Sequence, residues 1–434
     1  MFRRLFGVKE WVGQEALRQN LVANVLDGSL FAFGMSFVSL QTVLPVFVKR
    51  MGGSSFAVAL IPVLWTAGFN FPQILIAKYV QRFQRKKSLF LKTSFLQRLP
   101  WFFLALLTFL VIDRVDAAVG VVSFLSLFTL AAVVGSINFP IWFDLVAKLT
   151  PVEMRGRLFG ARNLLGGVLG VVGGWVVERV LGAVGYPTSY GVLFLLAVCA
   201  MMLSYASLTL LREESASPVA EPKRVAEYYR SLPRILKEQR NFRNFLVSDA
   251  LLIAATMAGA FYAVHAIEKF SLSDASAGTF TMVIMCSMIV GNLFFGWLAD
   301  HYGHKLNLVL SAVSATISCL AALVAPTATT YLLVFVASAF QVGLSGISRL
   351  SIVVELCTEE ERPTYVALTN MVTSPFVLFG VLAGGIASAF GYDAVFVIAG
   401  VLALASAFWL TFKVEEPRTK TAVPFVQSAQ YESS

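Results

Sequence analysis

Long apolar runs separated by short polar connections repeat along almost the whole chain. A helix of about 20 residues is needed to cross the roughly 30 Å apolar core of a bilayer, and the runs reach that length. They lack the alternation of barrel strands, whereas single crossing helices satisfy their own backbone groups in lipid. The pattern predicts about twelve membrane-spanning helices, over residues 21–47, 55–79, 88–111, 117–146, 158–182, 187–210, 244–267, 275–298, 305–325, 330–356, 364–389 and 393–412.

The composition supports an integral membrane protein made of helices. Of 434 residues, 57% are hydrophobic and only 14% are charged, which is too apolar for a soluble surface. The four cysteines fall in the apolar runs or at their ends without paired spacing, so we interpret them as packing residues. We expect no metal site and no cofactor.

The longest polar interruption follows the sixth apolar run and divides the chain into two halves of six spans each. Val225, Tyr229, Leu232 and Leu236 recur in it at near-helical spacing among basic residues, which favours a surface helix, interrupted near Pro233. The predicted organisation is an amphipathic N-terminus (1–20), a first six-helix bundle (21–210), a linker (211–243), a second six-helix bundle (244–413) and a tail (414–434).

The basic residues indicate how the chain lies in the membrane. Lys and Arg gather at both termini, in the linker and in the connections on the same side, and cytoplasmic connections are the basic ones. We therefore expect both termini and the linker to be cytoplasmic, in a bacterial-type inner membrane. The net charge of +9 is explained by this topology and by contact with anionic membrane lipids, so we expect no nucleic-acid partner.

The two halves show weak internal similarity. "AKYVQRFQRKKSL" (77–89) and "GWLADHYGHK" (296–305) both connect the second and third spans of a half, and both contain an aromatic residue and a basic pair. "LTPVEMRGRLFGARN" (149–163) and "CTEEERPTYVALTN" (357–370) each end in an Asn that lies eight residues after an Arg, Arg155 in the first and Arg362 in the second. Such repeats are typical of transporters whose binding site lies between the halves near the membrane midplane.

The second of these connections resembles the motif G-x-L-A-D-R-x-G-R/H-K-x-x-L of the major facilitator superfamily. The resemblance implies the twelve-helix fold of that family over the whole chain. The matching residues are Gly296, Leu298, Ala299, Asp300, Gly303, His304, Lys305 and Leu308.

The copy in the first half departs from the motif, because Ala77, Gln81 and Gln84 replace its first Gly, its Asp and its second Gly. Arg82 and Arg85 remain. The intact copy in the second half is therefore expected to carry more of the gating function.

The motif residues have a physical interpretation. Glycine is expected where backbones approach or φ is positive, at Gly296 and Gly303, and an acid such as Asp300 can cap exposed amides at a neighbouring helix start. The resemblance implies that such contacts hold the halves together in the outward-open state. The expected counter-ions are Asp144 for Arg85, and Glu355 for His304 or Lys305.

A few charges lie within the predicted spans, where burial is costly and usually functional or paired. Asp27 in span one and Arg98 in span three lie at similar estimated depths, so we expect them to pair. Burial would favour the protonated acid whenever its partner moved away, which suits a proton carrier. Asp249 occupies the corresponding place in span seven, and Arg349 is expected to reach the head groups from a span end.

Polar and aromatic side chains around these charges predict a roomy, mostly apolar cavity. Asn70 and Gln73 share one face of span two, and the candidate aromatic residues are Trp65 and Trp101. The glycine run 166–174 is interpreted as a close helix contact in span five.

Together these features predict a secondary active transporter, since the chain has no phosphate-binding G-x-x-x-x-G-K-S/T loop. The leading hypothesis is proton-coupled export of a small amphipathic organic compound by an antiporter, with sodium as the other possible ion and a monomer as the expected state. One alternative is proton-coupled uptake of a sugar or organic anion held by Arg98. Another is a membrane receptor or scaffold. No catalytic constellation favours an enzyme.

Overall fold

The computed structural model describes residues 15–80, 86–213, 235–358 and 361–417, and these are helical with no strand among them. Ten of the described helices are long and apolar enough to cross a membrane. The α2–α3 pair and α4 add two more crossings, so the described helices are consistent with the twelve predicted spans. Most of the expected surface helix of the linker, and most of the expected N-terminal one, lies outside the described residues.

Among the described residues the first half contains seven α-helices and the short 3-10 helix η1 (Ile112–Arg114), and its first span is broken. Residues 38–42 separate α2 from α3 because Pro45 has no backbone N–H to continue the helical bonding from Gln41. The helices of this half are α2 (Glu15–Phe37), α3 (Val43–Arg50), α4 (Ser55–Val80), α5 (Lys87–Leu110), α6 (Ala117–Leu149), α7 (Val152–Ala183) and α8 (Thr188–Thr209).

The second half repeats this plan with two broken spans. Its first span passes through the short 3-10 helix η2 (Thr256–Ala260), and its fifth through η3 (Ser374–Leu378), where Pro375 removes a donor. The α-helices are α10 (Arg240–Ala255), α11 (Tyr262–Phe270), α12 (Ser276–Tyr302), α13 (His304–Val324), α14 (Ala328–Glu355), α15 (Arg362–Thr373), α16 (Phe379–Phe390) and α17 (Tyr392–Lys413).

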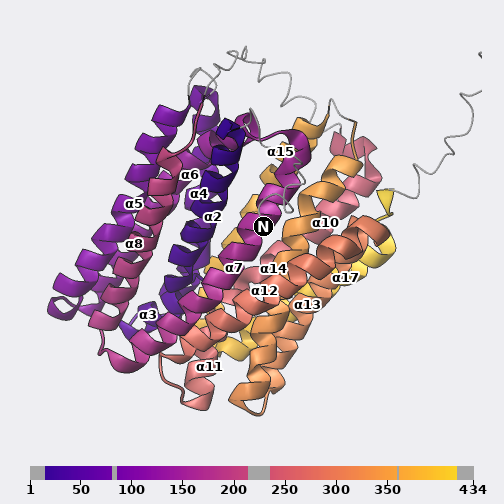
Figure 1. Cartoon of the computed structure of the whole chain (residues 1–434). Helices are drawn as coiled ribbons and strands as arrows, with labels where there is room; N and C mark the ends of the chain where they lie inside the picture. The colour runs from indigo at the N-terminus through magenta and orange to yellow at the C-terminus, as the bar shows by residue number, and fades with distance from the viewer. Residues whose placement is uncertain (1–14, 81–85, 214–234, 359–360, 418–434) are drawn as a thin grey trace, which may run out of the picture.

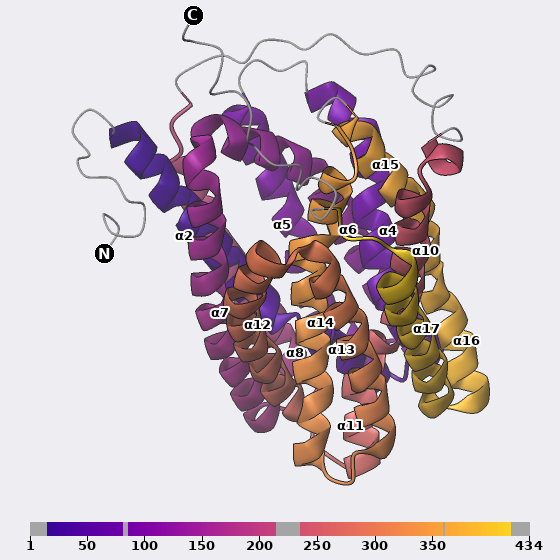
Figure 2. The ribbon, with the colours of Figure 1, turned by 90° about the vertical axis from the view of Figure 1, so that its right-hand side faces the viewer.

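The halves lie side by side, with the first half at one side of Figure 1 and most of the second at the other. They meet through α7 against α12 and α4 against α16, and Figure 2 shows α7 beside α12. A Cβ added at Gly174 would come within 2.8 Å of the Met282 amide nitrogen, and one at Gly278 within 2.3 Å of the Glu178 nitrogen. The interpretation of the glycine run as a close helix contact is confirmed.

The two ends of the molecule differ in how the halves meet. We call the end of the molecule at which α8 ends and α10 begins the linker end, and the end that carries α3 and α11 the far end (Figure 1). One large apolar cluster contains residues of both halves, among them Phe47 and Phe280, whereas each of the four smaller clusters belongs to a single half.

Ion pairs also join the halves at the far end. Lys49 Nζ lies 3.1 Å from Glu268 Oε1, and Arg50 Nε lies 3.8 Å from Asp274 Oδ2. The Tyr190 hydroxyl donates to Asp274 Oδ2 at 3.1 Å. The described structure is therefore packed shut at the far end.

Candidate functional site

A pocket of about 230 Å³ inside the first half brings together three of the residues expected at the site. Asp27 of α2, Trp65 of α4 and Arg98 of α5 all line it. Asp27 is buried within the protein and lies midway along α2, although it is an acid in a membrane span. Such a charge needs a partner, since an isolated carboxylate is costly to keep away from water.

The partner of Asp27 is Arg162 of α7, not Arg98. Arg162 Nη1 lies 3.3 Å from Asp27 Oδ2 and donates to the Asn24 carbonyl at 2.7 Å. The Arg162 guanidinium also lies over the Trp142 ring, 4.9 Å from its centroid, where a cation is attracted by the aromatic face. Arg162 therefore ties α2, α6 and α7 together at the pocket.

Arg98 reaches Asp27 through Ser204 of α8. Arg98 Nη2 donates to Ser204 Oγ at 3.0 Å, and Ser204 Oγ donates to Asp27 Oδ1 at 2.7 Å. Arg98 also donates to the carbonyls of Met201 and Ser94. The expected direct pair of Asp27 and Arg98 is wrong, because α8 places a hydroxyl between two side chains of similar depth.

Aromatic side chains form most of the remaining wall of this pocket. Trp65 stacks with Phe69 at 6.3 Å between ring centroids, and Phe139 lies 5.6 Å from Trp142. The Trp142 indole Nε1 is buried without a hydrogen-bond partner in the described structure. A polar cluster closes one side, where Asn138 Nδ2 donates to Gln97 Oε1 at 2.9 Å. The pocket suits an apolar body with at least one acceptor group.

A larger cavity of about 650 Å³ lies between the halves. Its lining comes from α2 and α7 of the first half and from α12 and α14 of the second, and it is mostly Gly, Met, Ile and small polar residues. Among the described residues that line it, Arg162 is the only one with a charged side chain. Arg162 lines both cavities, so it connects the space between the halves to the buried Asp27.

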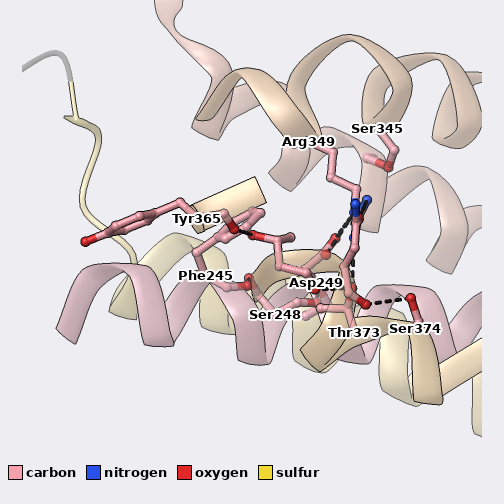
Figure 3. Close-up of polar contacts among 12 residues, drawn as sticks. Phe245, Ser248, Asp249, Ser345, Arg349, Tyr365, Thr373 and Ser374 are labelled. Carbon is pink, nitrogen blue, oxygen red and sulfur yellow. Dashed lines mark hydrogen bonds and ion pairs between the residues drawn. The ribbon is translucent and has the colours of Figure 1, made fainter. Parts of the chain in front are cut away.

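A second buried ion pair lies in the other half (Figure 3). Arg349 Nε of α14 lies 2.9 and 2.8 Å from the two oxygens of Asp249 on α10. Arg349 also donates to Thr373 Oγ1 at 2.8 Å and to Asn370 Oδ1 at 3.3 Å, both on α15. The expectation that Arg349 reaches the head groups is wrong, because the acid on α10 faces it within hydrogen-bonding distance.

The motif between α12 and α13 is formed as expected at Gly303 but not at Gly296. Gly303 has a φ of +88°, a conformation that favours glycine. A Cβ added at Gly296 would meet no atom within 4 Å, so the expected close approach there is wrong. Asp300 is exposed on α12. His304 Nε2 lies 3.8 Å from Glu355 Oε1, so the expected partners are neighbours.

Matching carboxylates hold the starts of α5 and α13. Glu213 accepts from the backbone N–H of Lys86 and Lys87 at 3.0 and 2.8 Å, and Glu416 Oε2 accepts from that of Lys305 at 3.2 Å. Lys148 Nζ lies 2.7 Å from Glu213 Oε1. Burial raises the pKa of the Glu213 carboxyl, but its hydrogen bonds from Lys148 and the two amides outweigh that effect and lower it.

The remaining candidate residues are more dispersed. Trp101 is buried 6.2 Å from Trp65, ring to ring, whereas Asn70 is exposed on α4. Asp144 pairs with Lys86. The side chain of Gln73 and both Arg82 and Arg85 lie outside the described residues.

Sequence reasoning missed Arg162, Ser204 and the partner role of Arg349. A signal for Arg162 exists, since it is a cation five residues into the predicted span 158–182. The serine carries no such signal, because most serines in spans bond to their own helix.

A cavity between two bundles of membrane-spanning helices, with buried charges at its wall, defines a multi-pass membrane transporter. The chain belongs to the major facilitator superfamily, since that family's model matches residues 9–174 and 245–430. The expected family is thereby confirmed, and its members are transporters, not enzymes.

Solved structures share the fold at low sequence identity. A D-xylose-proton symporter is 15% identical, with 93% of this chain and 99% of that chain covered and a TM-score of 0.67. The nucleoside transporter NupG is 14% identical, with coverages of 92% and 98% and a TM-score of 0.65. A bacterial homologue of the human lysosomal transporter Spinster is 13% identical, with coverages of 92% and 96% and a TM-score of 0.63. A comparison with curated protein sequences found no significant match.

Proposed function

We propose that the chain is a proton-coupled secondary transporter of small amphipathic organic compounds that carry an anionic group. The observation that carries the proposal is the position of Arg162, which lines the cavity between the halves and pairs with the buried Asp27. Arg98 and Arg162 together face one carboxylate in the pocket, so the described charges favour an added anion.

Coupling follows from competition for Arg162. While Asp27 is ionised, it holds the guanidinium, and its protonation removes the charge that does so. Arg162 is then available to a substrate carboxylate in the cavity between the halves. Proton and anion bind together under this scheme, which favours their movement in the same direction and therefore uptake.

The aromatic wall of the pocket supports an amphipathic substrate. Trp65, Phe69 and Phe139 offer faces for a ring or chain, and the buried Nε1 of Trp142 offers a donor to a polar substituent. A sugar would use more donors and acceptors than this wall supplies, so a compound with an apolar body fits better.

Proton-driven export of a neutral or cationic amphipathic compound is the second candidate. The mostly apolar lining of the cavity between the halves favours it. A cation would compete with the proton for Asp27, and competition of that kind produces exchange instead of cotransport. The sign of the substrate charge therefore decides between the two directions.

Proteoliposomes with a trapped pH dye test both candidates with three ligands of one size: benzoate, benzamide and benzylamine. Cotransport predicts that benzoate acidifies the lumen faster than it does in protein-free liposomes, and that Arg162→Gln loses this protein-dependent part. Asp27→Asn should lose accumulation driven by a pH gradient but keep benzoate exchange at equal pH. Luminal alkalinisation with inward benzylamine that exceeds the passive change in protein-free liposomes, and no protein-dependent response to benzoate, would instead establish exchange. Replacing the pH gradient with a sodium gradient tests the other ion.

The proposal places the linker end in the cytoplasm of a bacterial-type cell, as the basic connections favour. A single cysteine at Ser215, in the linker, should resist membrane-impermeant reagents in intact cells and react in inverted vesicles. Labelling from outside intact cells contradicts this orientation.

A further inference from the structure

A groove of about 550 Å³ lies on the outer flank of the first half at the linker end, between α5 and α8. These two helices form the left edge of the molecule in Figure 1. Neither buried cavity of the proposed transport path contains the residues of this groove. Its lining consists of Lys87, Ser88, Leu91, Lys92, Phe95 and Tyr205.

The groove changes from basic to apolar with depth. Lys87 lies at the first turn of α5, and its Nζ donates to the Thr209 carbonyl at the end of α8, at 2.9 Å. Lys92 is exposed five residues further on, roughly 7.5 Å at 1.5 Å per residue. Phe95 follows on the same face, 45% exposed, with its ring 5.9 Å from that of Tyr205. A molecule with a charged head and an apolar body matches this gradient.

The two ammonium groups are not neutralised by an acid of the groove itself. The six lining residues include no Asp or Glu. The nearby Glu213 accepts from Lys148 Nζ and from the amides of Lys86 and Lys87, which commits its oxygens to other donors. The lining of the groove therefore carries a net positive charge at the start of a predicted span, where lipid head groups are expected.

We propose that this groove is a binding site for one anionic phospholipid. Lys87 and Lys92 hold the phosphate, the Ser88 hydroxyl donates to it, and an acyl chain lies along Leu91 and Phe95. Basic pockets between helices near the cytoplasmic surface favour anionic over zwitterionic head groups, because each cation adds attraction in a site partly shielded from water.

The matching position in the second half shows that the fold does not require these residues. Lys305 Nζ donates to the Thr411 carbonyl at 3.1 Å, as Lys87 does to Thr209. Along α13, however, the positions that correspond to Ser88, Lys92 and Phe95 are Leu306, Leu310 and Val313. The second half therefore repeats the contact of a lysine with the neighbouring helix end but has no cation at the position of Lys92. This half provides a matched control.

Native mass spectrometry of the full-length protein tests the proposal, with phosphatidylglycerol and phosphatidylcholine of identical chains. We expect at least a tenfold preference for phosphatidylglycerol in the first bound lipid. Lys87→Gln/Lys92→Gln should lose that preference, and the control Lys305→Gln/Lys413→Gln, which removes the same charge at the same end, should keep it. Equal losses in both variants would overturn the proposal, because they would reveal attraction to overall charge.

A third variant and a competition experiment complete the test. Ser88→Glu adds a negative charge at an exposed position and should also lose the preference, even if the double variant folds poorly. Soluble glycerol phosphate should fail to compete at concentrations well above that of the lipid. Effective competition, or a full preference for phosphatidylglycerol in Ser88→Glu, would contradict a lipid site.

Discussion

Gly28 leaves the space that the Arg162 guanidinium occupies. A Cβ built on Gly28 would lie 2.3 Å from Arg162 Cζ, and no side chain other than glycine avoids that overlap. Because Arg162 is long and flexible, its head group would move before the helices did. Gly28 on α2 thus sets how closely Arg162 of α7 can approach the neighbouring Asp27.

Gly28→Ala should therefore disturb coupling while the protein still folds. Losing one charge-assisted contact, about 1.4 kcal/mol, corresponds to about a tenfold fall in pH-driven benzoate flux. Flux in proteoliposomes and thermal unfolding are the measurements. Gly156→Ala is the control, because a Cβ there would meet nothing within 4 Å. Unchanged flux in a well-folded Gly28→Ala protein would mean that the position of Arg162 does not control transport.

The Asp249–Arg349 pair should show the energetics of a buried ion pair. Asp249 is 4% exposed, so Arg349→Gln leaves a buried acid without its cation and should cost about 3–5 kcal/mol of stability. Asp249→Asn added to that variant should recover much of the loss. Denaturation in detergent measures both. If the double variant is no more stable than Arg349→Gln alone, the pair does not explain the instability.

The same experiment separates Asp249 from proton coupling. If Asp249 is structural, folded Asp249→Asn protein should retain flux driven by a pH gradient, whereas Asp27→Asn should not. A reversal of those two results would move the coupling site to the second half.

The far-end ion pairs should stabilise the conformation described here relative to one open at that end. Removing both with Glu268→Gln/Asp274→Asn should shift the population toward the other state by about twofold to about thirtyfold, since exposed pairs contribute about 0.2–1 kcal/mol each. Spin labels at the exposed positions Val152 and Tyr302, in a background without the four cysteines, report the distance across the linker end. Asp116→Asn, at the same end, is the control. No shortening relative to that control would contradict the role of these pairs.

Asp300→Asn should shift the equilibrium in the opposite direction. If Asp300 makes a contact specific to the state closed at the linker end, its removal favours the state described here by the energy of that contact. The same label pair should then report a larger fraction of long distances. His301→Gln is the control, because its ring bonds within its own helix to the Trp297 carbonyl. Equal populations in the two variants would exclude a state-specific contact of Asp300.

Glu213 should contribute stability that depends on pH. Its pKa is lowered on folding from an ordinary value of 4.5, so its contribution is complete above that value and is lost as pH falls through the lower folded value. Glu213→Gln should be less stable than the unchanged protein at neutral pH, by about 1–3 kcal/mol, and the two should converge in acid. Thermal unfolding from neutral pH to below pH 4 measures this. A difference that persists throughout would show that the charge is not responsible.

The sequence by itself determined the spans, the two halves and the depth of the buried charges. Run length sets how far a helix crosses, and residue number along a helix sets the height of each side chain, which is why Asp27 and Arg98 could be expected at one level. The positive φ of Gly303 could also be predicted, because the motif marks a tight connection in which glycine is favoured.

The tertiary structure alone decided the partners. Height along the membrane does not specify which way a side chain faces, and that depends on how each helix is rotated and packed against its neighbours. Helix α7 presents Arg162 to Asp27, and α8 inserts Ser204 before Arg98. Likewise α10 and α14 join Asp249 to Arg349, which the sequence placed at the head groups. Helix rotation thus determines which side chains become partners in a helical membrane protein, and a run of apolar residues carries little information about that rotation.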